Sequence, residues 1–424
     1  MQILWLIVPM LALIALRVPI AYAIGASAVG YALVTGSSAV SIIQRAVGGI
    51  DSFTLLAVPM FILAAEVMTR GGLARNLMDF LLSWLGPLRG GLASANIGGS
   101  VVFGGISGAA VADAAGLGRL LIPQMVERGY TPSYAAGVTA SSSLIGPILP
   151  PSIPFIVYGL LAQVSVGALF FAGIVPALLM AVGLMSVAYG IARKRRQPTH
   201  GHFRLREAVR LTIRNLPALA LPVLIIGGLR FGIFTPTEAG AAAVFYAFVY
   251  SLFYTRLSWN ESFVALRDAA ARTASILIIL AFAAHVGWLM SVEQVPAMIA
   301  EGLLSVSDNR YVILAIVVVF LLLVGVFLEA LAAMLILVPI LAPAMAQLGV
   351  DPIHFGVIVV LTLMMGLLTP PVGLVLYIVS DIATVDVIAV VKAALPFFAV
   401  LLITLTIVVL APGLVLALPT WAFG

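Results

Sequence analysis

The sequence contains no cysteine and few charged residues, which make up 9% of its 424 positions. The absence of cysteine excludes disulfide bonds and thiolate metal sites. The scarcity of charge excludes an ordinary soluble domain, in which about 25% of the residues are charged. Hydrophobic residues make up 63% of the chain, and apolar runs long enough to cross ~30 Å of hydrocarbon recur along it. The sequence therefore predicts an all-α polytopic membrane protein.

Positive charge gathers in one short stretch of the chain. Of the 21 basic residues, eight lie between positions 193 and 214, and Glu207 is the only acid among them. A cluster of this kind is typical of a loop on the cytoplasmic side of a membrane. We therefore interpret the net charge of +5 as a topology signal, and we expect a lipid bilayer and no nucleic acid as the partner of this chain.

Apolar segments of suitable length predict where the chain crosses the membrane once. The first, at 3–34, is interpreted as an uncleaved span, because a signal peptide would begin with a basic region that is absent here. Two segments with spaced charges, 71–85 and 256–272, are predicted to lie along the membrane interface. The remaining single crossings are expected at 52–69, 132–163, 167–192, 215–233, 236–255, 270–290, 352–380 and 387–412.

The helix-breaking residues of the chain repeat at a displacement of 220 residues without a gap. Self-similarity at a fixed displacement is the mark of an internal structural repeat. The matching positions are Gly105 and Gly325, Pro123 and Pro343, Gly129 and Gly349, Pro132 and Pro352, Gly146 and Gly366, Pro150-Pro151 and Pro370-Pro371, and Pro176 and Pro396.

Two further apolar stretches, 91–126 and 311–348, are too long for one crossing and contain internal breakers. Each is predicted to form either a re-entrant hairpin or a pair of crossings, and both alternatives leave the segments that follow on the same side of the membrane. Counting five crossings from the basic cluster places the C-terminus in the periplasm, and counting backwards places the N-terminus in the cytoplasm. The first copy of the repeat then ends inside and the second ends outside, so the copies are predicted to be inverted.

Interrupted helices in inverted repeats are typical of ion-coupled secondary transporters. Unwound backbone is tolerated at membrane depth only where it is buried in protein or lines a cavity. Breaks are expected at 104–108 and 141–152 in the first copy, and at 325–329 and 366–373 in the second. Hydroxyl and carbonyl oxygens at these breaks suit Na⁺ better than a transition metal. The alternative is that glycine and serine only allow close helix packing.

Four acidic residues lie within apolar segments, where ionised carboxylates are costly and often functional. Asp113, six residues beyond Ser107, is expected either to stabilise a hairpin tip or to face the cavity. Glu329 is expected either to hold a cation or to cap the second half of a hairpin. For Glu66 and Asp381 we favour a paired or capping role.

At these residues the sequence resembles the large membrane subunit of tripartite ATP-independent periplasmic (TRAP) transporters. The resemblance runs essentially from end to end of the chain. It is carried by Gly105-Ile106-Ser107-Gly108 with Asp113, by Gly146-Pro147-Ile148-Leu149-Pro150-Pro151-Ser152, by Gly325-Val326-Phe327-Leu328-Glu329 with Pro339 and Pro343, and by Thr369-Pro370-Pro371-Val372-Gly373.

The resemblance implies an elevator-type fold, in which two re-entrant hairpins and two broken helices form a mobile transport domain. The transport domain would consist of residues 91–166 and 311–386. Scaffold helices and an interfacial arm would occupy 1–90, further scaffold helices with the basic loop 193–214 would occupy 167–310, and a C-terminal scaffold helix would occupy 387–424.

The same resemblance implies a function as one component of a bacterial inner-membrane importer. Such a subunit would couple Na⁺ to the uptake of a small organic anion, carboxylate-bearing or similar to sialic acid. A periplasmic binding protein would deliver the solute, and a small membrane subunit would complete the scaffold. The alternative is a stand-alone ion-coupled transporter or Na⁺/H⁺ exchanger on a related fold. No enzyme activity is expected, because the serines lack a neighbouring base.

Site residues carried over from the resemblance fall at the breaks. One Na⁺ site would use Gly105, Ser107, Ser141, Ser142 and Gly146, with Asp113 in support. A second Na⁺ site would use Gly325, Glu329, Thr369 and Gly373. The solute would contact Ser107, Gly108, Ser143, Pro150, Thr369 and Pro370. The chain departs from the family pattern at Ala109, where a second hairpin serine is common, and at Glu329, where aspartate is common.

Overall fold

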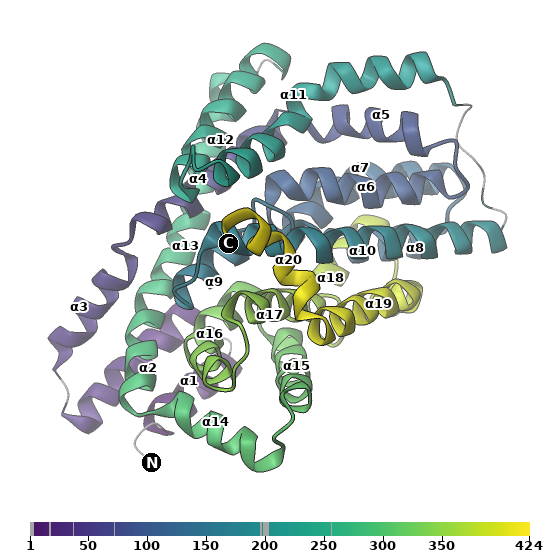
Figure 1. Cartoon of the computed structure of the whole chain (residues 1–424). Coiled ribbons are helices and arrows are strands. Elements are labelled where there is room, and N and C mark those ends of the chain that lie inside the picture. The colour runs from purple at the N-terminus through teal and green to yellow at the C-terminus, as the bar shows by residue number, and fades with distance from the viewer. Residues whose placement is uncertain are drawn as a thin grey trace.

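The computed structural model describes residues 4–16, 18–36, 38–71, 73–195, 197, 203–255 and 257–424. Helices dominate these ranges, and no strand occurs in them (Figure 1). Seven of the described helices are long and apolar enough to cross a bilayer, or eight if one bent pair counts as a single span. The prediction of an all-α polytopic protein is confirmed.

The N-terminal region differs from the predicted single span at 3–34. Two helices, α1 (Leu4–Ala15) and α2 (Ile20–Thr35), occupy it and pack against one another. Pro19 directly precedes α2, and proline cannot continue a helix because it lacks an N–H group and clashes with the preceding turn. Residues 3 and 17 lie outside the described residues. Further along the chain follow α3 (Ala39–Ile50), a 3-10 turn η1 (Phe53–Leu56), α4 (Ala57–Arg70) and α5 (Leu73–Leu85).

The first copy of the repeat forms a helical hairpin followed by a broken helix. The hairpin consists of α6 (Gly91–Ser107) and α7 (Ala110–Glu127), so the stretch 91–126 contains one tight turn. Gly108 ends α6 in the left-handed region at φ 59°, which glycine adopts without steric cost. The broken helix consists of α8 (Pro132–Ser143), a short 3-10 turn η2 (Gly146–Ile148) and α9 (Ile153–Leu161), bent by 45°.

The second copy reproduces these elements at the predicted displacement. Its hairpin consists of α15 (Arg310–Phe327) and α16 (Ala330–Gln347), and its broken helix of α17 (Pro352–Gly366) and α18 (Leu374–Ala383). Adding 220 to both bounds of α7 gives both bounds of α16. Gly129 and Gly349, which follow these two helices, both have positive φ angles, and the Pro150-Pro151 and Pro370-Pro371 bonds are both cis.

The remaining helices surround the two copies and correct three expectations. The expected interfacial segment 256–272 is not separate, because its described residues join the span 270–290 in one helix, α13 (Trp259–Val292), which Ser258 and Glu261 start with a capping box. The C-terminal segment 387–424 contains two helices, α19 (Val387–Leu410) and α20 (Pro412–Phe423). The unpredicted α14 (Val295–Val306) follows α13. The others are α10 (Val166–Lys194), α11 (Leu205–Arg230), α12 (Pro236–Tyr250) and a π-helical turn η3 (Ser251–Thr255).

The basic cluster at 193–214 is largely helical. Its first two residues end α10, and its second half forms the start of α11. Residue 196 and residues 198–202 of the predicted loop, like residues 72 and 256 of the predicted interfacial segments, lie outside the described residues.

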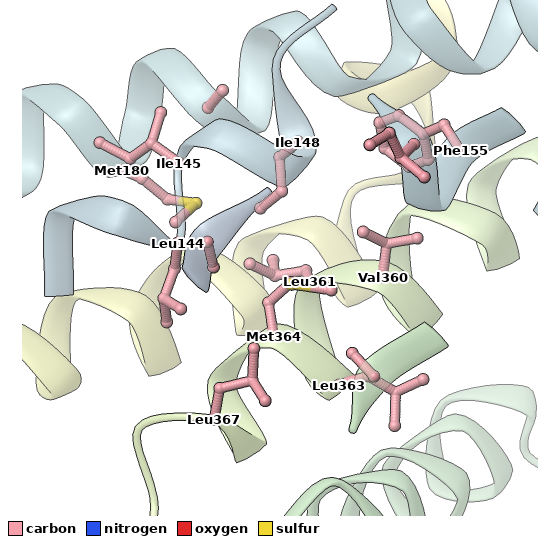
Figure 2. Packing of buried hydrophobic residues seen from close by; sticks show 14 of the residues in the cluster. Leu144, Ile145, Ile148, Phe155, Met180, Val360, Leu361, Leu363, Met364 and Leu367 are labelled. Carbon is pink, nitrogen blue, oxygen red and sulfur yellow. The ribbon is translucent and has the colours of Figure 1, made fainter. Parts of the chain in front are cut away.

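The two copies exchange the second halves of their broken helices. The α9 helix of the first copy packs on α16 and α17 of the second, while α18 packs on α7 and α8 of the first. The Tyr158 hydroxyl donates a hydrogen bond across this contact to the Pro352 carbonyl at 2.7 Å. Figure 2 shows the apolar core between the two broken helices, to which the first copy contributes Leu144 and Ile148 and the second contributes Leu361 and Met364. Each copy therefore completes the core of the other.

We expect Tyr158→Phe to destabilise this contact, because the half-buried Pro352 carbonyl loses its donor. Such a loss costs about 1 to 3 kcal/mol, and it should lower the midpoint of thermal unfolding in detergent. Tyr189→Phe is the control, since Tyr189 is 47% exposed. Equal midpoints for the two variants would contradict a role for the bond in joining the copies.

Candidate functional site

A cavity of about 690 Å³ opens between the first hairpin and the helices around it. This volume lies within the range of small-molecule sites, roughly 300–1,000 Å³. The cavity is lined by α4 and α13 on one side, by α7 on the other, and by the starts of α9 and α16. The charged and hydroxyl-bearing lining residues are Glu66, Thr69, Arg70, Ser107, Arg119, Arg272 and Ser275.

Three helix N-termini meet at one end of this cavity. Ala109, Ile153 and Leu331 line it, and they stand at the starts of α7, α9 and α16. The hairpin tip touches the start of α9 so closely that a Cβ added at Gly108 would lie 2.7 Å from the Pro151 carbonyl oxygen. Helix N-termini present unpaired N–H groups and partial positive charge. This end of the cavity is therefore suited to an anionic group.

Side chains cap two of these N-termini in part. Ser152 accepts from the Phe155 N–H at the start of α9. Glu329 accepts from the Ala332 N–H at 3.1 Å at the start of α16, so of the two roles expected for Glu329, the capping role is the one seen. Ala109 occupies the equivalent position of the first copy and has no side chain that can cap α7.

Asp113 joins the hairpin tip to the break in α8–α9. The Ser107 hydroxyl donates to its Oδ1 at 2.6 Å, which fits the expectation that Asp113 stabilises the tip. Its Oδ2 has no hydrogen-bond partner among the described residues, and a Cβ added at Gly146 would lie 2.7 Å from it. Asp113 is fully buried, and a buried carboxylate needs a bound cation or a proton to offset its desolvation. The unpartnered oxygen thus fits a hard cation.

Each hairpin crosses the break of its own copy at a pair of glycines. A Cβ added at Gly104 would lie 2.4 Å from the Gly146 Cα, and one added at Gly366 would lie 2.4 Å from the Gly325 carbonyl carbon. No side chain fits at these positions without moving backbone. The crossings bring backbone from two elements together twice, once in each copy, at or near the ends of the helical elements that carry these glycines.

The serine run of the first break does not reach the cavity. Ser141, Ser142 and Ser143 are buried, and their hydroxyls donate to helix carbonyls, those of Gly137 at 2.8 Å, Thr139 at 3.2 Å and Ala140 at 2.9 Å. None of the three lines the cavity.

A buried polar network holds α6 against α8 beside this serine run. The Asn96 amide donates to the Thr139 hydroxyl at 2.6 Å, and the Ser100 hydroxyl donates to the Ser142 hydroxyl at 2.9 Å. Sequence reasoning missed Asn96 and Ser100, although polar side chains inside the apolar stretch 91–126 were a usable signal. The network fixes the hairpin arm against the broken helix.

The structure brings only some of the predicted site residues together. Ser107 lines the cavity. Four other predicted residues do not line it and are buried in the protein interior: Gly105, Gly108, Ser143 and Pro150. Thr369, half-buried, donates to the Met365 carbonyl at 3.0 Å. Pro370 is exposed, and Gly373, at φ 39°, starts α18. These three residues of the second break do not line the cavity.

The other end of the cavity carries an ion-pair network that sequence reasoning predicted only in part. Glu66 pairs with Arg272 at 2.9 Å and with Arg70 at 3.6 Å, and Arg70 also pairs with Asp268 at 2.5 Å. The paired role of Glu66 is therefore confirmed. Asp381 is exposed, and its side chain makes neither an ion pair nor a capping hydrogen bond in the described part of the chain, contrary to the paired or capping role favoured for it.

Comparison with known proteins decides the family. The model of the family described as "Tripartite ATP-independent periplasmic transporter, DctM component" matches residues 7–414 of the chain. The chain belongs to this family. This TRAP permease is 38% identical over 408 residues to the sialic acid TRAP transporter large permease protein SiaM of Vibrio cholerae, with 96% of each chain covered.

A second relative is the C4-dicarboxylate TRAP transporter large permease protein DctM of Pseudomonas aeruginosa. It is 39% identical over 372 residues, which cover 88% of this permease and 87% of that one. Among solved structures, the YdaH transporter of Alcanivorax borkumensis matches with a TM-score of 0.64 at 17% identity, over 89% of this chain and 88% of that chain. The latter likeness is one of fold. The relatives are membrane permeases, and the predictions of a TRAP large subunit and of a protein that is not an enzyme are confirmed.

We expect Gly366→Ala to prevent the second crossing from closing, because the added Cβ would overlap the Gly325 backbone. The variant should unfold at a markedly lower temperature and lose uptake in reconstituted vesicles. Gly227→Ala, in α11, is the control, since a Cβ added at Gly227 meets nothing within 4 Å and alanine favours a helix by about 1 kcal/mol. A Gly366→Ala protein as stable as this control would contradict the crossing.

Proposed function

We propose that this TRAP permease couples Na⁺ to the import of a small carboxylate-bearing anion across a bacterial inner membrane. The observation that carries the proposal is the cavity where the N-termini of α7, α9 and α16 meet beside the Ser107–Asp113 pair. Helix N-termini at a break suit the carboxylate of a cargo, and nearby oxygens suit a coupling cation. The names of the relatives, which refer to sialic acid and C4-dicarboxylates, agree with such cargo.

The two glycine crossings are the proposed positions of the Na⁺ sites. At the first, the unpartnered Oδ2 of Asp113 and the backbone around Gly104–Gly105 and Gly146 supply oxygens, with Ser107 and the Ser141–Ser142 backbone nearby. At the second, Gly325 meets Gly366, and the ligands would come from this backbone, Glu329, Thr369 and Gly373. Na⁺ bound at a crossing would lower the cost of the unwound backbone, so ion and cargo binding would be coupled.

The mobile unit in this proposal is the interlocked pair of copies. The hairpins α6–α7 and α15–α16 would be re-entrant, and with the two broken helices they would move as one elevator domain against scaffold helices that include α4 and α13. The proposed cavity lies between these two units. A periplasmic binding protein would deliver the anion, and a small membrane subunit would bind the scaffold.

Uptake by the complete system tests the coupling. Purified permease, reconstituted with its small subunit and binding protein, should accumulate its anion many-fold faster with an inward Na⁺ gradient than with an equal K⁺ gradient. Ser107→Ala should raise the Na⁺ concentration for half-maximal uptake several-fold, because Asp113 loses the hydroxyl that orients it. Equal uptake in Na⁺ and K⁺ would exclude Na⁺ coupling, and uptake driven by a proton gradient alone would favour the exchanger-like alternative.

The proposed topology places the C-terminus in the periplasm, because five crossings separate it from the basic cluster. The N-terminus is proposed to be cytoplasmic, which requires that the short helices α1, α2 and α3 make one net crossing. Fusions of alkaline phosphatase to the C-terminus should be active, and fusions of green fluorescent protein to the N-terminus should fluoresce. An inactive C-terminal phosphatase would contradict the inverted arrangement.

A further inference from the structure

The cavity has a second feature that the proposed ion and carboxylate sites leave unused, a group of arginines at the end away from the helix N-termini. Arg70 comes from α4, Arg119 from α7 and Arg272 from α13, and all three line the cavity. Two of these helices belong to the proposed scaffold and one to the first hairpin. The group therefore spans the boundary between the two units.

Each helix presents this surface as one stripe. On α7 the lining residues are Ala112, Ala115, Gly116 and Arg119, at the spacing of one helical face. Small residues fill the stripe as far as Arg119, where the first long side chain stands. Arg119 lies nine positions beyond Ala110, so its Cα lies about 14 Å along the helix from the N-terminus. The small residues leave an open path between the two positions.

Positive charge is in excess at the arginine end. Two carboxylates, Glu66 and Asp268, pair there with three guanidinium groups, those of Arg70, Arg267 and Arg272. Arg119 has no ion pair among the described residues and is exposed to the cavity. Glu261 also interacts with Arg70, so four arginines stand against three carboxylates and the cluster holds one more positive than negative charge. Guanidinium groups bind carboxylates through paired N–H donors, so a cargo carboxylate is the counterion that this cluster lacks.

We propose that Arg119, together with Arg272 and Arg70, forms a second anion-binding position for the cargo, at the arginine end of the cavity. The inference rests on the proposed function in assuming that the cargo is an anion. In this arrangement the carboxylate moves between two binding positions. One is formed by the helix N-termini at the hairpin tip, and the other, the arginine station, by the arginines at the opposite end. Arg119 acts as a binding residue of the arginine station.

The absence of cysteine from the chain allows a direct test on the full-length purified protein. Ala115→Cys places one thiol on the cavity stripe, one helical turn before Arg119. The rates of labelling by an anionic reagent, sulfonatoethyl methanethiosulfonate, and by a cationic one, trimethylammonioethyl methanethiosulfonate, are then compared. Arg119→Ala should lower the ratio of anionic to cationic rates roughly five- to tenfold, because removing a charge at this distance acts on the two reagents in opposite directions.

Matched variants separate charge from structure. Arg119→Lys should restore most of the ratio, Arg272→Gln should lower it independently, and Arg210→Ala, on α11 and away from the cavity lining, should leave it unchanged. Succinate should slow labelling of Cys at position 115 by neutral N-ethylmaleimide, whereas glycerol should not, and Arg119→Ala should abolish this protection.

A ratio unaffected by both Arg119→Ala and Arg272→Gln would overturn the proposal, as would succinate protection that is absent or equally strong without Arg119. The labelling requires neither Na⁺, nor partner subunits, nor transport. Failure of Na⁺-driven uptake with an intact labelling pattern would therefore count against the proposed coupling alone, and the reverse result would count against the arginine station alone.

Discussion

Backbone groups that leave a helix inside a bilayer find no water to bind, and this constraint organises the structure. In each copy the hairpin meets its broken helix where two glycines touch, Gly104 with Gly146 and Gly325 with Gly366. Hydrogen is the only side chain that allows such contact, so the backbone of the hairpin and that of the broken helix pack directly on one another beside each break. The left-handed conformation of Gly108 at the end of α6 serves the same contact. It reverses the chain within one residue, which keeps the hairpin tip next to the break.

The high cost of polar groups inside a bilayer also limits where ionisable residues occur. The chain has few ionisable residues, and those in and beside the cavity fall into two different environments. Asp113 is fully buried with one oxygen unpartnered, whereas Glu66 is shared between two arginines at a more open end. One environment suits a bare cation held by oxygens, and the other suits an anion held by guanidinium groups. The cavity and the hairpin tip beside it thus offer opposite chemistry a few helical turns apart.

Glycine and proline positions made much of the fold predictable from the sequence. The displacement of 220 residues anticipated both bounds of α16 from those of α7, since the backbone conformations that demand these residues recur in both copies. The paired role of Glu66 was also predictable, because an acidic residue within an apolar segment needs a partner. The division of 3–34 into α1 and α2 was not foreseen, because composition reports apolar length and not the turn before Pro19. The arginines of the cavity were missed for a different reason. They come from α4, α7 and α13, and no local pattern tells which distant helices will share a surface. The hydroxyls of Ser141–Ser143 were expected at the site, but helical serines readily donate to a carbonyl of the preceding turn.

The exchange of broken-helix halves has a consequence for how the chain is made. The α9 helix finds its packing surface on α16 and α17, and the Tyr158 hydroxyl finds its acceptor 194 residues later in the sequence. Contacts of such long range form late in folding. The first copy therefore emerges from the ribosome well before the elements that cover its break exist, and it must wait in the membrane with an unfinished core. Biogenesis of this protein is then a problem of timing, in which a half-made repeat has to be shielded until its counterpart is synthesised.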